Sequence, residues 1–380
     1  MRHHQLGTGR IRTALGIAAI VAAPALATIA TAPAAGALTT ITVTTTNDGG
    51  AGSLRDAFDQ ANDAAPDNAE IVLATGARYQ LDDCELGALE HDEANTLTIT
   101  GHGSTIEQTC EGDRVITNIF GGAGHLTLID VTITGGNVNT TTGGGGIGAT
   151  STGLTLVNTT IAGNSAGTGG AVFVTGQGSL VATNSTFADN VATSTSGTGG
   201  VEAQGSITLA YVTITGNTAG GTDEPANLRT GDTLTSFGSV IAQPLGTDTY
   251  NCVVQSTGVS QGYNWSDDDT CELDTATDVD DGIDPGLLPL APGLPTGSTA
   301  LVRVPVTGTS PLTVRSPLID AIPNGACQTG AAAGVTTDEL LAPRPSPTGG
   351  ACDIGAIEVQ ATAGGSTPPP EVVVAPRFTG

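Results

Sequence analysis

"LTLVNTTIAGNSA", residues 154–166, is one copy of a phrase that recurs along the chain. Similar phrases are "LTLIDVTITGGN" from residue 126, "SLVATNSTFADNVA" from 179 and "SITLAYVTITGNTA" from 206. The last large apolar residues of the copies, Ile133, Ile161, Phe187 and Ile214, are 28, 26 and 27 residues apart, and Ile241 follows 27 residues later. A second column, Leu126, Leu154, Leu180, Ile207 and Leu234, keeps the same step. A repeat of this length predicts a solenoid.

Within each copy, apolar and small polar residues alternate, as they do in a strand with one buried face. In the first copy, Leu126, Leu128, Val131 and Ile133 are expected to face inward, with a corner near Asp130. Short strands at a constant step, without helical periodicity, predict an all-β chain. We expect a right-handed parallel β-helix with about 27 residues per coil, in which each strand pairs with its copy about 4.8 Å away.

The corners of the coils carry a column of asparagines. Asn164, Asn190 and Asn217 each follow a ladder residue by three positions, so they are expected to stack. Asparagine tolerates left-handed backbone, and its amide can bond the backbone of neighbouring coils. Threonines are expected to face outward, and two sets of them should stack: Thr132, Thr160, Thr186 and Thr213, and Thr127, Thr155 and Thr208. Threonine suits an outward strand position, which explains these sets without an ice-binding function.

Residues 53–62, "SLRDAFDQAN", predict a helix. Ser53 can cap it, and Leu54, Ala57, Phe58 and Ala61 form one apolar stripe. A solenoid has an open apolar end, and we expect this helix to cover the first coil.

The first 37 residues have the layout of a secretory signal peptide. Arg2, Arg10 and Arg12 precede the apolar run "ALGIAAIVAAPALATIA", and a small-residue cleavage site ends at Ala37. The expected organisation is a signal peptide (1–37), an N-terminal cap with the first strands (38–94), β-helix coils (95–290), a C-terminal β region (291–360) and a Pro-rich tail (361–380). The expected location is therefore secreted, with cell-surface association as an option, and no integral membrane segment remains after cleavage.

The composition is acidic and poor in aromatic residues. The net charge is −26, and 3% of residues are aromatic. Such a charge repels nucleic acids and anionic lipids, which excludes both as main partners.

Six cysteines in an exported chain predict disulfides. Sequential pairing is favoured, Cys84 with Cys110, Cys252 with Cys271, and Cys327 with Cys352. The 26-residue spacing of the first pair nearly equals one coil, so this bond should join adjacent coils.

Several stretches resemble known families. "TTTNDGGAGSLRDAFDQAN" (44–62) is similar to the opening motif of bacterial exported right-handed β-helix proteins of the CSLREA type. "SPLIDA" (316–321) and "CDIGAIE" (352–358) resemble the closing motifs of the related choice-of-anchor group. "GGAVF" (169–173) and "FADN" (187–190) resemble the repeats of polymorphic outer-membrane proteins, which are associated with adhesion. The resemblance implies an exported β-helix and no established chemistry.

Two departures from these motifs are visible. Gly52 stands where the opening motif often has cysteine, and "TDELLAPRP" (337–345) stands where the closing motif commonly has Asp-Gln-Arg-Gly before Arg-Pro.

The predicted function is non-catalytic: a secreted or surface protein that binds an extracellular polysaccharide or a cell-surface ligand through its faces and loops. The alternative is a polysaccharide lyase or glycoside hydrolase, which needs carboxylates converging on neighbouring coils. Coils following Asp130 and Asp189 do not repeat these acids, and residues 126–243 hold one arginine, Arg229, and no histidine. We therefore predict no catalytic residues and no bound organic cofactor.

The acidic segment 267–284, "DDDTCELDTATDVDDGID", is the candidate metal site. Asp278, Asp280, Asp281 and Asp284 offer oxygen ligands suited to calcium, although their spacing does not match an EF-hand. The other interpretation is a solvated acidic loop held by a Cys252–Cys271 bond.

Overall fold

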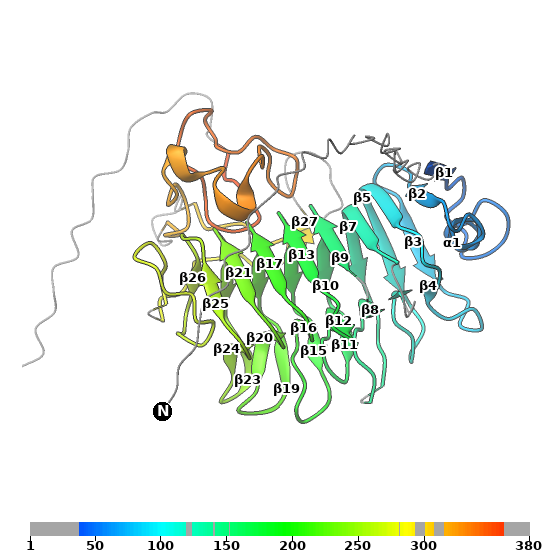
Figure 1. Cartoon of the computed structure of the whole chain (residues 1–380), viewed down its shortest axis with the longest axis horizontal. Coiled ribbons are helices and arrows are strands. Elements are labelled where there is room, and N and C mark those ends of the chain that lie inside the picture. Colours follow the sequence, from blue (N-terminus) through cyan, green and yellow to red (C-terminus); the bar gives the residue numbers. More distant parts are fainter. Residues whose placement is uncertain are drawn as a thin grey trace, which may run out of the picture. The chain divides into compact units, whose positions relative to one another are not determined.

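The computed structural model describes residues 38–118, 124–139, 141–151, 153–280, 282–292, 301–307 and 315–360. The predicted signal peptide and Pro-rich tail lie outside these residues. The described chain is a parallel β-helix of about 8 turns. Corresponding strands of successive coils lie side by side, in the order of the coils along the chain (Figure 1). The predicted all-β fold, with coils of about 27 residues and one α-helix, is confirmed.

The strands lie on four faces, and each face stacks corresponding strands of successive coils in parallel. The first face consists of β1 (Leu38–Thr42), β2 (Asn68–Val72), the first parts of β5 (Leu97–Gln108) and β7 (Leu126–Thr134), β9 (Leu154–Val157), β13 (Leu180–Thr183), β17 (Ile207–Ala210), β21 (Leu234–Phe237) and β25 (Gly258–Ser260). The second face consists of β3 (Arg78–Leu81), the remainder of β5 and β7, β10 (Thr160–Ala162), β14 (Thr186–Ala188), β18 (Thr213–Thr215), β22 (Val240–Ala242) and β26 (Trp265–Ser266). Because β5 and β7 continue around the corner between them, these two faces form one 15-stranded sheet.

Two smaller sheets complete the coils. The third face consists of β11 (Ser165–Ala166), β15 (Val191–Ala192), β19 (Thr218–Thr222) and β23 (Leu245–Thr247). The fourth face consists of β4 (Leu89–His91), β6 (Ile116–Asn118), β8 (Ile147–Thr150), β12 (Val172–Thr175), β16 (Val201–Ala203), β20 (Pro225–Thr230) and β24 (Tyr250–Val254).

Both predicted apolar columns are confirmed by the strand register. Phe187 lies between Ile161 and Ile214 on the second face, and all three are 0% exposed. On the first face, Leu154 pairs with Leu126 and Leu180. Each coil therefore buries its apolar residues against the next coil, which a single coil could not do.

In four successive coils, one left-handed residue turns the corner between the first and second faces. Asp130, Asn158, Asn184 and Tyr211 hold φ angles of 53°, 51°, 45° and 55°. The predicted corner near Asp130 is confirmed. Left-handed backbone suits asparagine and aspartate but is unusual for a bulky residue, so Tyr211 must be held there by tertiary contacts.

The predicted asparagines stack as a hydrogen-bonded ladder. The Nδ2 of Asn164 donates to Oδ1 of Asn190 (3.1 Å), and that of Asn190 donates to Asn217 (2.9 Å). The sequence suggested that these asparagines turn the corner themselves, but they do not. The left-handed residues are their predecessors, Gly163 (φ 66°), Asp189 (φ 56°) and Gly216 (φ 66°).

The ladder extends beyond the predicted members. Asn217 donates to Asn227 (2.9 Å), Asn227 to Asn251 (2.7 Å), and Asn251 to Oδ1 of Asp267 (2.7 Å). The bonds from one ladder side chain to the next all run in the same direction along the chain, while Asn164, Asn190 and Asn217 also donate to carbonyl oxygens of the preceding coil. A carboxylate, which only accepts when ionised, is a suitable final member.

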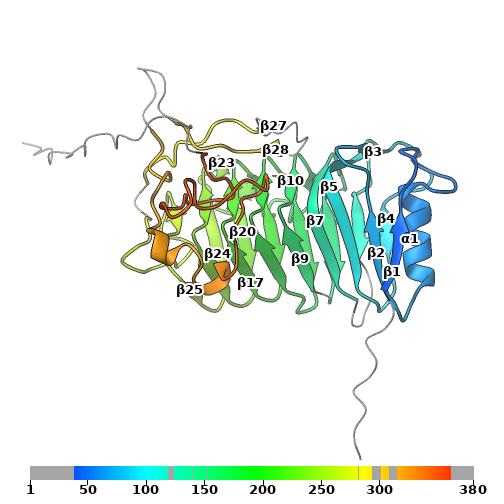
Figure 2. The same ribbon diagram turned by 90° about the horizontal axis from the view of Figure 1, so that it is seen from above.

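The N-terminal end is covered by α1 (Leu54–Asp63), as predicted. The Ser53 side chain accepts a hydrogen bond from the N–H of Asp56, and Leu54, Ala57, Phe58 and Ala61 are the buried residues. Figure 2 shows α1 at the end of the β-helix beside β1, β2 and β4. Among the described residues, no helix is long and apolar enough to span a membrane.

The described part of the predicted C-terminal β region, 291–360, is mostly irregular. It contains the short antiparallel pair β27 (Ala291–Pro292) and β28 (Leu301–Val302) and two 3₁₀ helices, Asn324–Ala326 and Gly330–Ala332. Residues 315–360, called the C-terminal segment here and coloured orange to red in Figures 1 and 2, fold back onto the coils.

The C-terminal segment corrects one prediction, that the second-face threonines form an exposed polar surface. Thr132, Thr160, Thr186 and Thr213 are each at most 1% exposed. Thr160 and Thr186 donate to the Glu339 carboxylate (2.8 and 2.5 Å), and Thr213 Oγ1 accepts from the N–H of Ala356 (3.0 Å). Alternation shows only which side of a strand faces the lumen, so it could not reveal a second layer outside. On the first face, Thr127, Thr155 and Thr208 are half-buried.

All three predicted disulfides are present. Their Cα–Cα distances are 5.4 Å for Cys84–Cys110, 4.8 Å for Cys252–Cys271 and 5.9 Å for Cys327–Cys352. The first joins adjacent coils, because Leu81 and Gln108 pair in parallel just before the two cysteines.

Candidate functional site

The acidic segment 267–284 closes the last coil rather than forming a free loop. Asp278 accepts hydrogen bonds from the N–H of Asn264 (2.8 Å) and the hydroxyl of Ser260 (2.5 Å). Asp284 accepts from Gln243 Nε2 (3.2 Å). These carboxylates satisfy donors that a further coil would otherwise bond.

This arrangement does not show a set of ligands for the predicted calcium ion. Asp280 is exposed, and Asp281 lies outside the described residues. Among the residues that the structure describes, no three His, Cys, Asp or Glu side chains are grouped so that they could hold a metal ion. Calcium binding stays a prediction.

Charged side chains do converge on the fourth face, contrary to our expectation. Glu202 pairs in register with Arg229 on the next coil, and Arg229 lies 2.5 Å from Glu224 and 3.9 Å from Glu202. The sequence contained the signal, because Glu202 and Arg229 are 27 residues apart, one coil length. The prediction failed because it followed only the columns of Asp130 and Asp189. Both carboxylates are engaged by one guanidinium, so this cluster joins coils together.

A second charged cluster, called the buried network here, belongs to the C-terminal segment and faces the coils on which this segment packs. Its members are each at most 2% exposed: Asp338, Glu339, Arg344, Asp353 and Glu358. Arg344 Nη1 lies 3.7 Å from Glu358, and its Nη1 and Nη2 donate to the carbonyl oxygens of Asp353 (2.8 Å) and Gly355 (2.9 Å). The guanidinium also lies 3.9 Å from the ring centroid of Tyr211.

The buried network also packs against Tyr211. The Tyr211 hydroxyl donates to the carbonyl oxygen of Cys327 (2.6 Å), and the Arg344 guanidinium lies over the Tyr211 ring. Two segments supply the whole network: 352–358, which resembles a closing motif, and 337–345, which departs from one. Both therefore help to dock the C-terminal segment on the coils.

Burial raises the pKa values of the buried carboxyl groups. It raises the pKa of Glu358 to about 7, against the opposing effect of Arg344, and the pKa of Asp353 to about 6. Burial also raises the pKa of Glu339 well above its usual value, although the Thr186 and Thr160 hydroxyls stabilise its anion. One arginine cannot compensate this many carboxylates, so the network favours protonation.

Replacing Glu339 by glutamine is expected to stabilise the protein at pH 8 by about 1–3 kcal/mol, the usual cost of a poorly compensated buried polar group. The folded-state pKa of Glu339 lies above the unfolded value, so the folded protein binds the extra proton. Its stability therefore falls as pH rises from the unfolded towards the folded pKa, and glutamine removes that loss. The amide of glutamine can bond both threonines. Urea unfolding at pH 5 and pH 8 measures the effect.

The matched control for Glu339 is Glu272→Gln, because Glu272 is exposed. It should change the free energy of unfolding little at either pH. A stabilisation by Glu339→Gln that is larger at pH 5 than at pH 8 would contradict the assignment of a raised pKa.

Two adjoining cavities lie at the other end of the β-helix and together are called the N-terminal groove. The first, about 520 Å³, is lined by residues of α1, β4 and loop 82–88, including Asp59, Glu90 and Asp92. The second, about 420 Å³, includes Glu90, Asp113, Arg114 and Thr117. Leu86, Ala88 and Glu90 line both cavities, so the two cavities adjoin.

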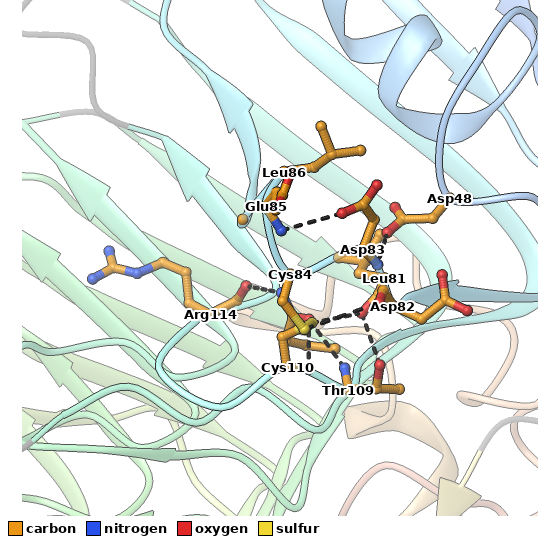
Figure 3. The surroundings of a disulfide bond; sticks show 12 residues. Asp48, Leu81, Asp82, Asp83, Cys84, Glu85, Leu86, Thr109, Cys110 and Arg114 are labelled. Carbon is orange, nitrogen blue, oxygen red and sulfur yellow. Dashed lines mark hydrogen bonds between the residues drawn. A yellow bond between two sulfur atoms is a disulfide. The ribbon is translucent and has the colours of Figure 1, made fainter.

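The walls of the groove are fixed in place. The Cys84–Cys110 disulfide joins loop 82–88 to loop 110–114 (Figure 3). Arg55 of α1 bonds Asp48 (2.5 Å) and donates to the carbonyl oxygens of loop residues 86, 87 and 88. Asp48 also accepts the N–H of Asp83 (2.7 Å). A groove held this way loses little conformational entropy when a ligand binds.

The groove presents polar side chains that the protein itself does not use. Within the described residues, the carboxylates of Asp59, Glu90, Asp92 and Asp113 form no hydrogen bond or ion pair. Leu86, 48% exposed, adds an apolar contact. Sequence reasoning flagged the disulfide but missed these residues, because they belong to the first coils, before the regular repeats that we compared.

No protein-family model matches the chain, and no curated protein or solved structure matches it significantly. Function has to be inferred from the residues of the chain itself.

Proposed function

We propose that the protein is an extracellular β-helix protein that binds a glycan in the N-terminal groove without cleaving it. The observation that carries this proposal is a groove of two adjoining cavities whose walls are fixed and in which four carboxylates form no hydrogen bond or ion pair within the described chain: Asp59, Glu90, Asp92 and Asp113. Free carboxylates beside a small apolar surface can bind the hydroxyls and the apolar face of a sugar.

An extracellular location has independent support. Three disulfides suit an oxidising compartment. The N-terminal sequence has the layout of a signal peptide, and the opening and closing motifs resemble those of exported bacterial β-helix proteins. A surface adhesin built on this scaffold is the form of the proposal that these similarities favour.

The alternative is a glycoside hydrolase acting in the same groove. Asp59, Glu90 and Asp92 line one cavity, and hydrolysis of a glycosidic bond uses two carboxylates facing each other. The charged clusters elsewhere do not favour this alternative, because Glu202 and Glu224 share Arg229 and the buried network is closed to solvent.

The test is retention of the protein, residues 38–380, on a panel of immobilised neutral and acidic polysaccharides, with and without calcium, followed by assay of the eluate for new reducing ends and unsaturated sugars. We expect retention without product. Glu90→Gln combined with Asp92→Asn should weaken retention about 10-fold or more. The control, Glu272→Gln with Asp274→Asn, changes the net charge equally at exposed positions outside the groove.

Retention on no member of the panel would refute glycan binding. Product release would support the hydrolase or lyase alternative. Equal losses in the groove variant and its control would show that net charge, and not the groove, determines retention.

A further inference from the structure

Arg114 differs from every other arginine in the described residues. Each of the others forms an ion pair with a carboxylate: Arg55, Arg78, Arg229, Arg303, Arg315 and Arg344. The Arg114 guanidinium forms no ion pair or hydrogen bond within the described chain, although its side chain is half-buried and lines the second cavity of the groove. Figure 3 shows the side chain extending away from the Cys84–Cys110 disulfide.

The Arg114 guanidinium packs over a glycine of the fourth face. A Cβ atom on Gly148 of β8 would lie 1.8 Å from Arg114 Nη1, and the three nearest atoms all belong to Arg114. Gly148 lies between Thr117 and Phe173 in the register of the fourth face. Any larger residue at position 148 would therefore displace the guanidinium from the sheet.

The energetics favour an added partner for Arg114. Burial lowers its pKa, and Glu90 opposes this shift without forming a hydrogen bond. A guanidinium carries five donors in a planar fork that matches the two oxygens of a carboxylate. A ligand carboxylate would supply the hydrogen-bond acceptors that the Arg114 guanidinium lacks within the described chain.

We propose that Arg114 binds the carboxylate of a uronic acid residue in the glycan that occupies the N-terminal groove. This inference rests on the proposed glycan binding and specifies the ligand class. Thr117, Glu90 and Asp113 line the same cavity and are placed to bond hydroxyls of the same sugar.

The charge of the protein restricts the ligand further. A net charge of −26 repels densely charged polyanions, and Glu90 and Asp113 stand beside Arg114. The favoured ligand is therefore a neutral chain with isolated uronic acids, rather than a continuous polyuronate.

The probe is a xylan with isolated glucuronic acid side groups, compared with the same xylan after chemical reduction of its carboxyl groups. Polygalacturonate and a sulfated galactan are the other two arms. We expect the native protein to prefer the unreduced xylan over all three. Arg114→Gln should weaken its binding about 10- to 100-fold and remove the preference over the reduced xylan.

Gly148→Ala provides a second variant that keeps the arginine. It should weaken binding in the same direction by moving the guanidinium, and combining it with Arg114→Gln should cause little further loss. Arg78→Gln is the control, because this substitution removes the same charge outside the groove. Arg78 pairs with Glu107 on the surface. Thermal unfolding of each variant confirms that it is folded.

The outcomes separate the two proposals. Equal binding of reduced and unreduced xylan, or an unaffected Arg114→Gln variant, would overturn the role of Arg114 and leave glycan binding standing. Tighter binding of the sulfated galactan or polygalacturonate would overturn the ligand class. Failure to retain any glycan would overturn both proposals.

Discussion

Replacing Arg344 by methionine is expected to lower the free energy of unfolding by about 3–5 kcal/mol, the usual cost of removing one partner from a buried ion pair. Within the described part of the chain, Arg344 is the only cation among the buried carboxylates Asp338, Glu339, Asp353 and Glu358. Without it, Glu358 loses its counter-charge, and the carbonyl oxygens of Asp353 and Gly355 lose their donors. Methionine fills similar volume, so the loss reports charge and hydrogen bonding rather than a large cavity.

Urea unfolding measures the total loss, and amide hydrogen exchange locates it. The N–H of Ala356, which donates to Thr213, should lose protection before the ladder amides, because the C-terminal segment can open without the coils. Arg315→Met is the matched control in the same segment, since Arg315 and its partner Asp320 are 41% and 46% exposed. It should cost less than about 1 kcal/mol.

A second variant tests the charge argument directly. Adding Glu358→Gln to Arg344→Met removes the carboxylate left without its cation, so the double variant should recover part of the stability at pH 8. A loss below about 1 kcal/mol for Arg344→Met, or no recovery in the double variant, would contradict a charge-dependent network.

The coils were predictable from sequence because their apolar residues repeat at the period of the structure. Ile161, Phe187 and Ile214 obey both the two-residue alternation of a strand and the 27-residue step of a coil, and only stacked coils satisfy both. The helix at 54–63 and the Cys84–Cys110 bond were predictable for similar local reasons: a cap residue before an apolar stripe, and a spacing near one coil.

Contacts made outside the lumen were not predictable in this way. The threonines of the second face have the same alternation whether water or another segment covers them. Glu339, the partner of Thr160 and Thr186, lies more than 150 residues further along the chain. The groove was missed for a related reason. Its residues come from α1, loop 82–88 and loop 110–114, and no shared period links them. The motif-like segments 337–345 and 352–358 were visible as patterns, but their docking role needed coordinates.

Replacing Phe187 by alanine is expected to cost about 3–5 kcal/mol. Phe187 is 0% exposed and stands between Ile161 and Ile214, whose strands are held in register on both sides. Because paired strands on either side prevent the coils from collapsing inward, most of the phenyl volume should remain as a cavity. Thr186 cannot serve as an exposed control, since it bonds Glu339.

Val181 of β13 is the suitable control for Phe187, because it points outward and is 39% exposed. Val181→Ala should cost less than about 1 kcal/mol in the same urea unfolding experiment. The loss from Phe187→Ala should also be independent of pH between 5 and 8, since its register neighbours Ile161 and Ile214 do not titrate. The loss from Arg344→Met should change over that range. Similar losses from Phe187→Ala and Val181→Ala would mean that the stacked apolar ladder does not carry the stability of the coils.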